Sequence, residues 1–392
     1  MRKAAAVYSG FPELFRMEYK VINTMSTPAE KAMREAIQKV ATGPEYSKDL
    51  SFEEARAAMR HALSDEADDV RTAVFLIALR MKRETDEENR GILAAIQETN
   101  VTAEVDVDEL VDVADPYDGH SRGLPMNAFV PAVLAACGVP AFCHGLDKVG
   151  PKYGITAHKV LRSAGIDVGK SPQQAAADIA EHGWAYVDQA AFAPRLHALI
   201  PLRERIVKRQ VITTVEVLTR PLTGRRKTHL LTGYVHKAYP PIYISLARAA
   251  GYDSAMIVRG VEGGIIPSLQ QPALLHHYHG DQEAEVTELA PQALGIEQTT
   301  RAVPLPKDLP PAPAADDIAT PFDVDAAARA AAKAGLAALH GEKGPAYDAL
   351  VYAASIVLHH LGQAASLADA GEQVRHMLND GQAAARFDAL VA

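Results

Sequence analysis

The sequence predicts an α/β protein with a small all-helical lobe and a larger α/β lobe, whose mostly parallel central sheet is flanked by helices. Residues 28–100 show helical patterns with no strand pattern between them. Beyond this segment, short β-type runs alternate with helical segments, which is typical of parallel βαβ units with helices on the sheet faces. The chain has 392 residues, 48% of them apolar, so it can bury cores of this size.

Composition excludes several classes of protein. Two cysteines in this length rule out a disulfide framework. We find no secretory signal and no run of about 18 uncharged apolar residues, so we predict a cytoplasmic protein with no membrane partner. The net charge of −9 argues against a protein that binds nucleic acid over its whole surface, but the charges are unevenly placed along the chain.

Capping signals define the helices of the first lobe. Ser51 followed by Glu54 is a capping box, and Thr85 followed by Glu88 is a second one. Apolar residues after Ser51 repeat at helical spacing, so one face of that helix is predicted to be buried. The helices predicted for this lobe are 28–41, 51–63, 70–82 and 85–99.

The α/β lobe is predicted from alternating short elements. Its strands are 139–143, 184–188, 228–233 and 254–260, followed by a more exposed pair near 276–278 and 285–287. Its helices are 127–137, 155–164, 171–182, 240–250, 323–340, 344–361 and 366–379. A proline-rich segment, 303–322, is predicted to be an extended connector before the last helices.

Five segments resemble the anthranilate phosphoribosyltransferase family and occur in the family's order. They are FLIALRMKRETDEE at 75–88, CGVPAFCHG at 137–145, RGVEGG at 259–264, APQALGI at 290–296 and the helical segment 341–374. The resemblance implies a site in the cleft between the lobes and a homodimer formed through the helical lobe. It also implies two domains, a helical lobe of residues 1–105 with helices from about 171–209 (one at about 171–183 and one at about 192–209), and an α/β domain of 106–170 and 210–392.

The motifs that bind phosphoribosyl pyrophosphate in that family are altered here. The segment 114–125, ADPYDGHSRGLP, stands where the family has its Gly-Thr-Gly-Gly-Asp loop, and only Gly119 remains in the loop proper. Glycines in such a loop let backbone N–H groups approach an anion. Ile265 and Ile266 stand where the family has its Mg²⁺-binding Asp-Glu pair, and their side chains cannot ligate a metal. We therefore predict that the chain does not convert anthranilate, and that it holds no cofactor and no metal.

Two further motifs of the resemblance survive in part. His144 and Gly145 remain from a Lys-His-Gly-Asn motif, and Gly260, Glu262 and Gly263 fit a tight turn after a strand. Such turns lie at the carboxyl end of a sheet, where ligands bind in α/β folds. His144 could act as an acid, a base or an anion contact, or it could be structural at a strand end. No catalytic residue is assigned beyond this possibility.

Similar departures mark a branch of nucleic-acid-binding paralogues that lack the transferase activity, and this sequence resembles that branch. We therefore predict binding of nucleic acid, or of another polyanion or phosphorylated ligand, in the cleft. Its predicted phosphate contacts are Arg122, Lys148, Lys152, Arg203, Arg205, Lys208 and Arg209. The alternatives are a glycosyl or phosphoribosyl transferase with a non-anthranilate substrate, and a purely structural or regulatory dimer.

Basic and histidine-rich segments allow competing interpretations. In the basic run 203–227, Arg205, Lys208 and Arg209 would share one helical face that binds phosphates, or the run is a solvated surface. The lysines of 148–159 line the cleft or form a solvated loop. The segment His276-His277-Tyr278-His279 contains a His-x-His pair that could bind zinc, but no third ligand is evident in the sequence. His359 and His360 are interpreted as surface or packing residues.

Overall fold

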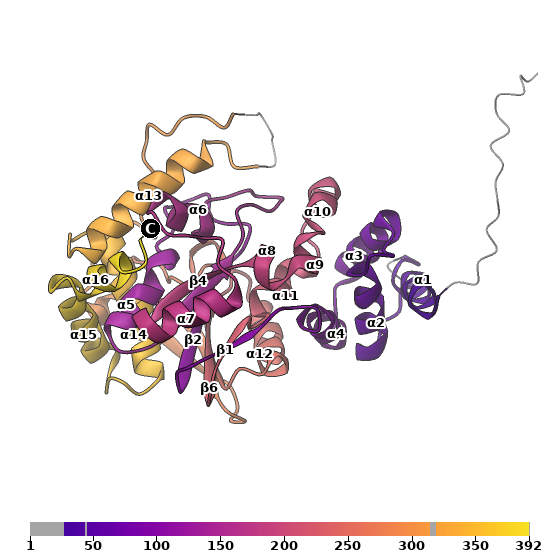
Figure 1. Cartoon of the computed structure of the whole chain (residues 1–392), viewed down its shortest axis with the longest axis horizontal. Helices are drawn as coiled ribbons and strands as arrows, with labels where there is room; N and C mark the ends of the chain where they lie inside the picture. The colour runs from indigo at the N-terminus through magenta and orange to yellow at the C-terminus, as the bar shows by residue number, and fades with distance from the viewer. Residues whose placement is uncertain (1–26, 44, 314–318, 392) are drawn as a thin grey trace, which may run out of the picture.

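The computed structural model describes residues 27–43, 45–313 and 319–391, so the predicted helical lobe is described from residue 27 onward. Figure 1 shows the helices α1 to α4 at one end of an elongated molecule and the sheet with its covering helices at the other. This arrangement confirms the predicted fold class. No helix in the described segments is long and apolar enough to cross a membrane.

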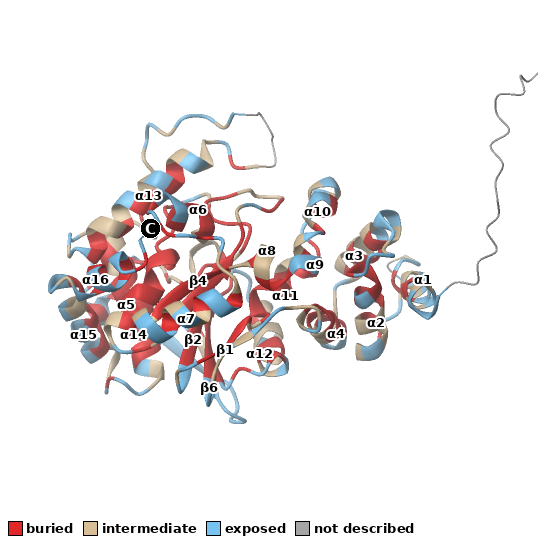
Figure 2. Cartoon of the chain, viewed as in Figure 1, coloured by how far each residue is buried: buried red, intermediate tan, exposed pale blue. Residues whose placement is uncertain are grey.

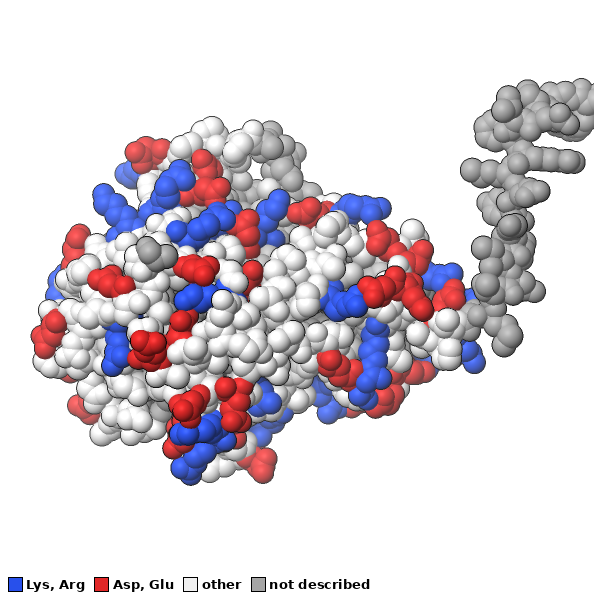
Figure 3. Space-filling model, viewed as in Figure 1, with Lys and Arg blue, Asp and Glu red and all other residues white. Residues whose placement is uncertain are grey.

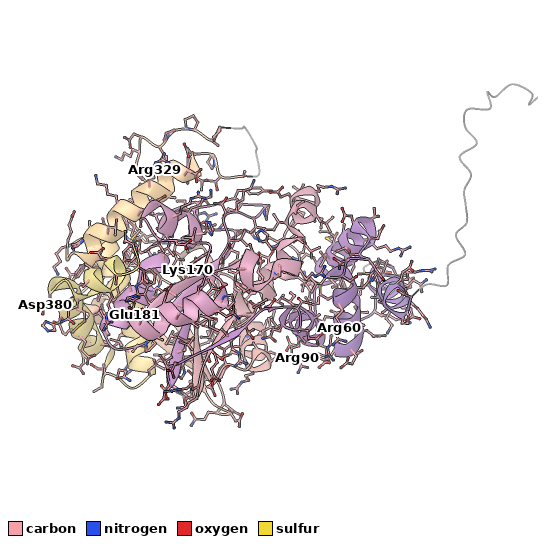
Figure 4. The ribbon with its side chains drawn as sticks, viewed as in Figure 1. Arg60, Arg90, Lys170, Glu181, Arg329 and Asp380 are labelled. Carbon is pink, nitrogen blue, oxygen red and sulfur yellow. The ribbon has the colours of Figure 1, made fainter. Side chains whose placement is uncertain are left out.

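The helical lobe is built from capped amphipathic helices. Both predicted capping boxes are present, with reciprocal hydrogen bonds between Ser51 and Glu54 and between Thr85 and Glu88. Gly91 lets two of these helices touch, because a Cβ placed there would lie 2.4 Å from the carbonyl oxygen of Phe52. The helices are α1 Pro28–Val40, α2 Phe52–Ala62, α3 Asp69–Lys82 and α4 Asp86–Gln97. Arg60 on α2 and Arg90 on α4 are labelled in Figure 4 and lie away from the sheet.

The α/β lobe contains a seven-stranded sheet in the order β4-β3-β2-β6-β7-β8-β9. Neighbouring strands from β4 to β7 pair in parallel, whereas β7–β8 and β8–β9 pair antiparallel. A short parallel pair, β1 with β5, stands apart. The strands are β1 Ala103–Val105, β2 Glu109–Ala114, β3 Ala141–Gly145, β4 Trp184–Asp188, β5 Leu222–Gly224, β6 Lys227–Gly233, β7 Ser254–Val258, β8 Ala273–His279 and β9 Glu285–Leu289.

Each sheet face is covered by its own set of helices. Along β2, Val111 and Val113 enter one hydrophobic core while Leu110 and Ala114 enter the other, as alternation along a strand requires. Figure 2 shows the resulting buried centre of the lobe. The covering and connecting helices are α5 Val130–Ala136, α6 Ala157–Ser163, α7 Pro172–His182, α8 Gln189–Phe192, α9 Pro194–His197, α10 Ile200–Ile206, α11 Ile212–Val215, α12 Tyr239–Ala250, α13 Val324–Leu339, α14 Pro345–His360, α15 Leu367–Asn379 and α16 Gln382–Asp388.

One predicted helix is wrong. Residues 192–209 do not form a continuous helix, because the chain breaks around Pro194 into short helices and α10 ends at Ile206. Val207 adopts a left-handed conformation with φ 67°, which ends the helix. Arg205, Lys208 and Arg209 therefore do not share a helical face.

The helices α7 and α10, from the middle of the chain, pack against different parts of the molecule. α10 packs against α3 of the helical lobe, whereas α7 packs against β4 and β1. The predicted division of the chain, with 1–105 and about 171–209 in one domain and 106–170 and 210–392 in the other, stays a prediction.

A cationic cleft between the lobes

A large open cleft lies at the carboxyl ends of the central strands, with about 2640 Å³ of empty space. Its walls come from the loops after β2, β6 and β7, together with residues 209–214 and Arg80 of α3. Both lobes therefore contribute to it. The carboxyl edge of a parallel sheet is the place where α/β folds bind ligands.

The cleft is positive although the whole chain is negative. Six cationic side chains line it against two carboxylates, Asp118 and Glu262, an excess of four, while the formal charge of the chain is −9. The six cations are Arg80, Arg122, Lys152, Arg209, Arg259 and Arg301. On the face drawn in Figure 3, acidic and basic groups are interspersed over both lobes. The cationic excess is thus a local property of the cleft.

Two of these cations are held by a buried carboxylate. Asp118 is only 4% exposed, and its Oδ2 accepts hydrogen bonds from Nε of Arg209 at 3.1 Å and Nη2 at 2.5 Å. Lys152 Nζ lies 3.5 Å from Asp118 Oδ1 and 3.5 Å from Glu262 Oε2. Asp118 therefore fixes the positions of Arg209 and Lys152 at the cleft wall.

Three arginines of the cleft are exposed and have no ion-pair partner in the described part of the chain. They are Arg122, Arg259 and Arg301. An anionic ligand could contact them without breaking an existing ion pair, so their guanidinium groups are available for charge-assisted hydrogen bonds.

Aromatic rings stand beside these charges. Tyr239 and Tyr243, one turn apart on α12, line the cleft with ring centroids 5.7 Å apart, and His236 lies 6.1 Å from Tyr239. The described residues of the cleft therefore combine guanidinium groups with flat aromatic surfaces.

The Glu262 carboxylate accepts hydrogen bonds from backbone N–H groups of the loop after β2. Its carboxylate accepts hydrogen bonds from the backbone N–H of Arg122 at 2.6 Å and of Ser121 at 3.1 Å, and from the Ser121 hydroxyl at 3.1 Å. Burial raises the pKa of Glu262, but the charges of His120 and Lys152 and these N–H groups outweigh it, so the pKa is lowered. Glu262 is therefore ionised at neutral pH and acts as an internal anion in this loop.

The turn that presents Glu262 depends on glycine. Glu262 itself adopts φ 56°, an uncommon conformation for a residue with a Cβ. A Cβ on Gly260 would lie 1.6 Å from the carbonyl oxygen of Gly264, and Gly263 has φ 85°. The predicted tight turn at the end of β7 is thus present, and it directs Glu262 toward the opposite loop.

A second buried pair supports the same loop. His120 Nε2 lies 2.6 Å from Asp115 Oδ2, and Asp115 Oδ1 accepts the backbone N–H of Ile265 at 3.0 Å. Burial lowers the pKa of His120, but the Asp115 charge and hydrogen bond outweigh it, so the pKa is raised. These bonds connect the loop after β2 to the turn after β7.

Comparison with known proteins places the chain in a family. The family described as "Glycosyl transferase family, helical bundle domain" matches residues 34–99. An uncharacterized protein of Aquifex aeolicus is 31% identical over 264 residues, 67% of this chain and 75% of that one. The anthranilate phosphoribosyltransferase of Sphingopyxis alaskensis is 27% identical over 349 residues, 89% of this chain and 97% of that one.

This chain belongs to the anthranilate phosphoribosyltransferase family. The predicted resemblance is confirmed at this level, while membership of the nucleic-acid-binding branch stays a prediction. Solved structures agree on the fold: the Thermus thermophilus enzyme aligns with TM-score 0.69 at 22% identity, covering 92% of this chain and 98% of that one. The Saccharomyces cerevisiae enzyme in complex with PRPP and Mg aligns with TM-score 0.70 at 15% identity, covering 92% of this chain and 96% of that one.

The family fold brings three of the predicted phosphate contacts together. Arg122, Lys152 and Arg209 line the cleft. Lys148, Arg205 and Lys208 are exposed but lie outside its lining. Lys148 Nζ lies 3.8 Å from Glu204, and Arg205 Nη1 lies 3.0 Å from Asp69 of α3.

Arg203 and His144 are buried rather than presented to a ligand. Arg203 is 2% exposed and makes two 2.7 Å hydrogen bonds to Glu216. His144 is 2% exposed, with Nδ1 hydrogen-bonded to the Tyr117 hydroxyl and Nε2 2.9 Å from Asp112 Oδ1. The Nε2 contact lacks hydrogen-bond geometry. These contacts favour the structural interpretation of His144, and they remove Arg203 from the set of available cations.

The sequence interpretation missed three cleft arginines. Arg80 lies on α3, Arg259 directly precedes the Gly260 turn, and Arg301 lies beyond β9. Only Arg259 carried a usable signal, since it stands beside the glycine turn at a strand end. The other two reach the cleft through tertiary packing.

Proposed function

We propose that this protein binds single-stranded nucleic acid in the cleft between its lobes. The observation that carries the proposal is the pairing of a local cationic excess with the aromatic strip His236, Tyr239 and Tyr243. Proteins that bind single strands combine positive grooves with aromatic side chains on which bases stack. A phosphorylated polyanion without bases would use the charges alone.

Arginine geometry supports phosphate contacts without sequence readout. The guanidinium groups of Arg122, Arg259 and Arg301 have no ion-pair partner among the residues the structure describes, and these planar groups suit bidentate contacts to phosphate oxygens. Such contacts position a strand and carry no sequence information. We therefore expect weak sequence preference.

The alternative is a transferase that acts on a substrate other than anthranilate. The family relationship and the yeast neighbour solved with PRPP and Mg favour it. Arg122 and Lys152 would then hold a phosphate. Against it, Glu262 already fills the loop N–H groups, and Ile265, fully buried, stands where the resemblance places a metal ligand. We propose that the phosphoribosyl pyrophosphate and Mg²⁺ sites are degenerate.

A titration of the purified protein with fluorescent single-stranded and double-stranded DNA at two salt concentrations tests the proposal. We expect micromolar or tighter binding of the single strand that weakens steeply with salt. Calorimetry with phosphoribosyl pyrophosphate and Mg²⁺ runs in parallel, and no heat of binding is expected. A heat signal without DNA binding would favour the transferase.

Removing the Glu262 carboxylate should partly open the loop to anions. Glu262→Ala leaves the N–H groups of Ser121 and Arg122 and the Lys152 ammonium without their anion. We expect the free energy of unfolding to fall by about 2 kcal/mol. We also expect millimolar pyrophosphate to raise the melting temperature of the variant more than that of the wild type, since only the variant has vacant N–H groups in this loop.

Glu288→Ala is the control for this change, because it removes an exposed carboxylate on β9 away from the cleft. It should leave stability and the response to pyrophosphate unchanged. Equal responses of wild type and Glu262→Ala to pyrophosphate would contradict the internal-anion interpretation.

We propose that the protein is a homodimer joined through the helical lobe. An apolar stripe on the outer side of α3 supports this, formed by Val70, Val74 and Met81, which are 69%, 41% and 79% exposed. These positions are spaced by about one and two helical turns and thus lie on one face. Exposed apolar stripes mark interaction surfaces.

Charges placed in this stripe should produce a monomer. We expect Val74→Glu/Met81→Glu to have the monomer mass of 42.0 kDa in light scattering after gel filtration, and the wild type twice that. Val286→Glu on β9 is the matched control, since Val286 is 57% exposed but lies on the other lobe. A monomeric wild type would contradict the proposal.

A cytoplasmic location remains part of the proposed function.

A further inference from the structure

Three histidines meet at the antiparallel edge of the sheet, on the face opposite the neighbouring His276. His277 and His279 alternate with Tyr278 on β8 and so point to one side, and His360 is the last residue of α14. Candidate ligand atoms of the three rings all lie within 4.8 Å of one another. The rings of His279 and His360 are stacked 4.0 Å apart, and His277 lies edge-on to His360 at 5.6 Å. Tertiary packing thus supplies the third histidine that was not evident from the sequence.

We propose that His277, His279 and His360 bind one Zn²⁺ ion. Three imidazole nitrogens form a common zinc ligand set, with Zn–N distances of about 2.0–2.1 Å, which puts tetrahedral ligand atoms about 3.4 Å apart. The present separations are no more than 4.8 Å, so they exceed this value by at most about 1.4 Å, a gap that side-chain rotation can close. His279 is exposed and the other two are half-buried, so the rings have room to turn without moving β8 or α14.

Hydrogen bonds to the outer ring nitrogens favour metal binding. Nε2 of His277 lies 3.0 Å from the Thr287 hydroxyl, and Nε2 of His360 lies 2.9 Å from the Ser254 hydroxyl. The second nitrogen of each ring remains for an ion. Metal-bound histidines typically hold their other nitrogen in this way, which fixes the orientation of the ring.

The fourth position would face solvent. His279 is exposed, and Glu285, opposite His277 in the β8–β9 register, is the nearest acidic residue on the partner strand. A water molecule or Glu285 would complete four ligands. Imidazole also suits Cu²⁺ and Ni²⁺, but a flexible tetrahedral set of three histidines fits Zn²⁺, which has no geometric preference of its own. The ion would join the end of α14 to the sheet edge.

The site is independent of the proposed nucleic-acid cleft. His276, between the cluster and the cleft, points to the other face and contacts the ring of Tyr234, a cleft residue, at 5.6 Å. None of the three histidines lines the cleft. Failure of DNA binding would therefore not contradict the zinc proposal. Failure of Zn²⁺ binding would likewise not contradict the proposal that the cleft binds nucleic acid.

Competition of untagged, metal-free protein with a chromophoric chelator for Zn²⁺ tests the proposal. We expect one Zn²⁺ per chain, an increase in melting temperature on adding the ion, and a Co²⁺ absorption spectrum of four-coordinate intensity. His279→Ala and His360→Ala should each weaken Zn²⁺ binding by about 100-fold. His279 is exposed, so its loss leaves the fold intact even if loss of His360 does not.

His276→Ala is the matched control, because it removes the adjacent histidine from the opposite face of the same strand. It should bind Zn²⁺ as the wild type does. Equal weakening in His276→Ala and His279→Ala, or wild-type affinity no greater than that of His279→Ala, would mean adventitious binding only and would overturn the proposal.

Discussion

Arg122→Glu/Arg259→Glu is expected to lower the affinity for single-stranded DNA by about 100-fold at moderate salt. Each reversal removes a charge-assisted phosphate contact of about 1.5 kcal/mol and adds repulsion. Neither side chain has an ion-pair partner in the described segments, so the change should not disturb folding. The measurement is fluorescence anisotropy at two or more salt concentrations, with circular dichroism to verify the fold.

The salt dependence gives a second readout of the same variant. Single strands lose affinity with a log–log slope of about −0.7 for each phosphate neutralised. Loss of two contacts should therefore reduce the slope by about 1.4. A fall in affinity with an unchanged slope would mean that the arginines act on the shape of the cleft and do not contact phosphate.

Arg225→Glu/Arg226→Glu is the control with an identical change in charge. These arginines pair with Asp106 and Asp108 at the amino end of β6, at the opposite edge of the sheet. Affinity should fall less than about twofold. An equal loss in both variants would show that net charge alone governs binding, which would contradict a defined cleft.

Arg205→Glu separates the sequence-based interpretation from the structural one. Sequence reasoning placed Arg205 with Lys208 and Arg209 on one phosphate-binding face, whereas the helix ends at Ile206 and Arg205 pairs with Asp69. Binding should be nearly unchanged in this variant.

Local sequence signals predicted most elements of the fold, because the start of a helix and the course of a strand depend mainly on residues close in the sequence. Capping boxes at Ser51 and Thr85 set two helix starts within one residue, and the apolar runs of β4 and β6 marked buried strands. The central strand β2 was missed, because its ELVDVA sequence interrupts an apolar run with Asp112. That carboxylate is buried and accepts the Tyr252 hydroxyl at 2.6 Å, a partner far away in sequence.

The candidate site was less predictable, because tertiary contacts decide whether a side chain is free to contact a ligand. Both Arg122 and Arg203 were predicted from the sequence to contact phosphate. In the structure Arg122 is exposed in the cleft, whereas Arg203 is buried. His360 illustrates the opposite case, since only packing of α14 on the sheet places it beside His279. Residue type and spacing indicate which ligands a side chain could bind. Long-range packing decides whether that side chain is placed where it can bind them.

Glu216→Ala is expected to lower the free energy of unfolding by about 3–5 kcal/mol. Arg203 on α10 and Glu216 are each 1% exposed in their side chains and form a two-bond ion pair, with Gln189 as a further donor to Glu216 at 3.3 Å. Removing the carboxylate leaves a buried guanidinium without its counter-charge, which is far costlier than losing the hydrogen bonds alone. Chemical denaturation at neutral pH measures the change.

Two comparison variants separate this cause from simple loss of contacts. Arg203→Met/Glu216→Leu removes both charges and keeps apolar volume, so it should lie within about 1–2 kcal/mol of wild type. Asp106→Ala breaks an exposed pair with Arg225 and should cost less than about 1 kcal/mol. If Glu216→Ala were as mild as Asp106→Ala, the Arg203 charge would have to reach solvent or another anion, and Arg203 would return to the set of phosphate contacts. A large loss, recovered in the double variant, would instead establish that this arginine joins α10 to the interior and is not available to a ligand.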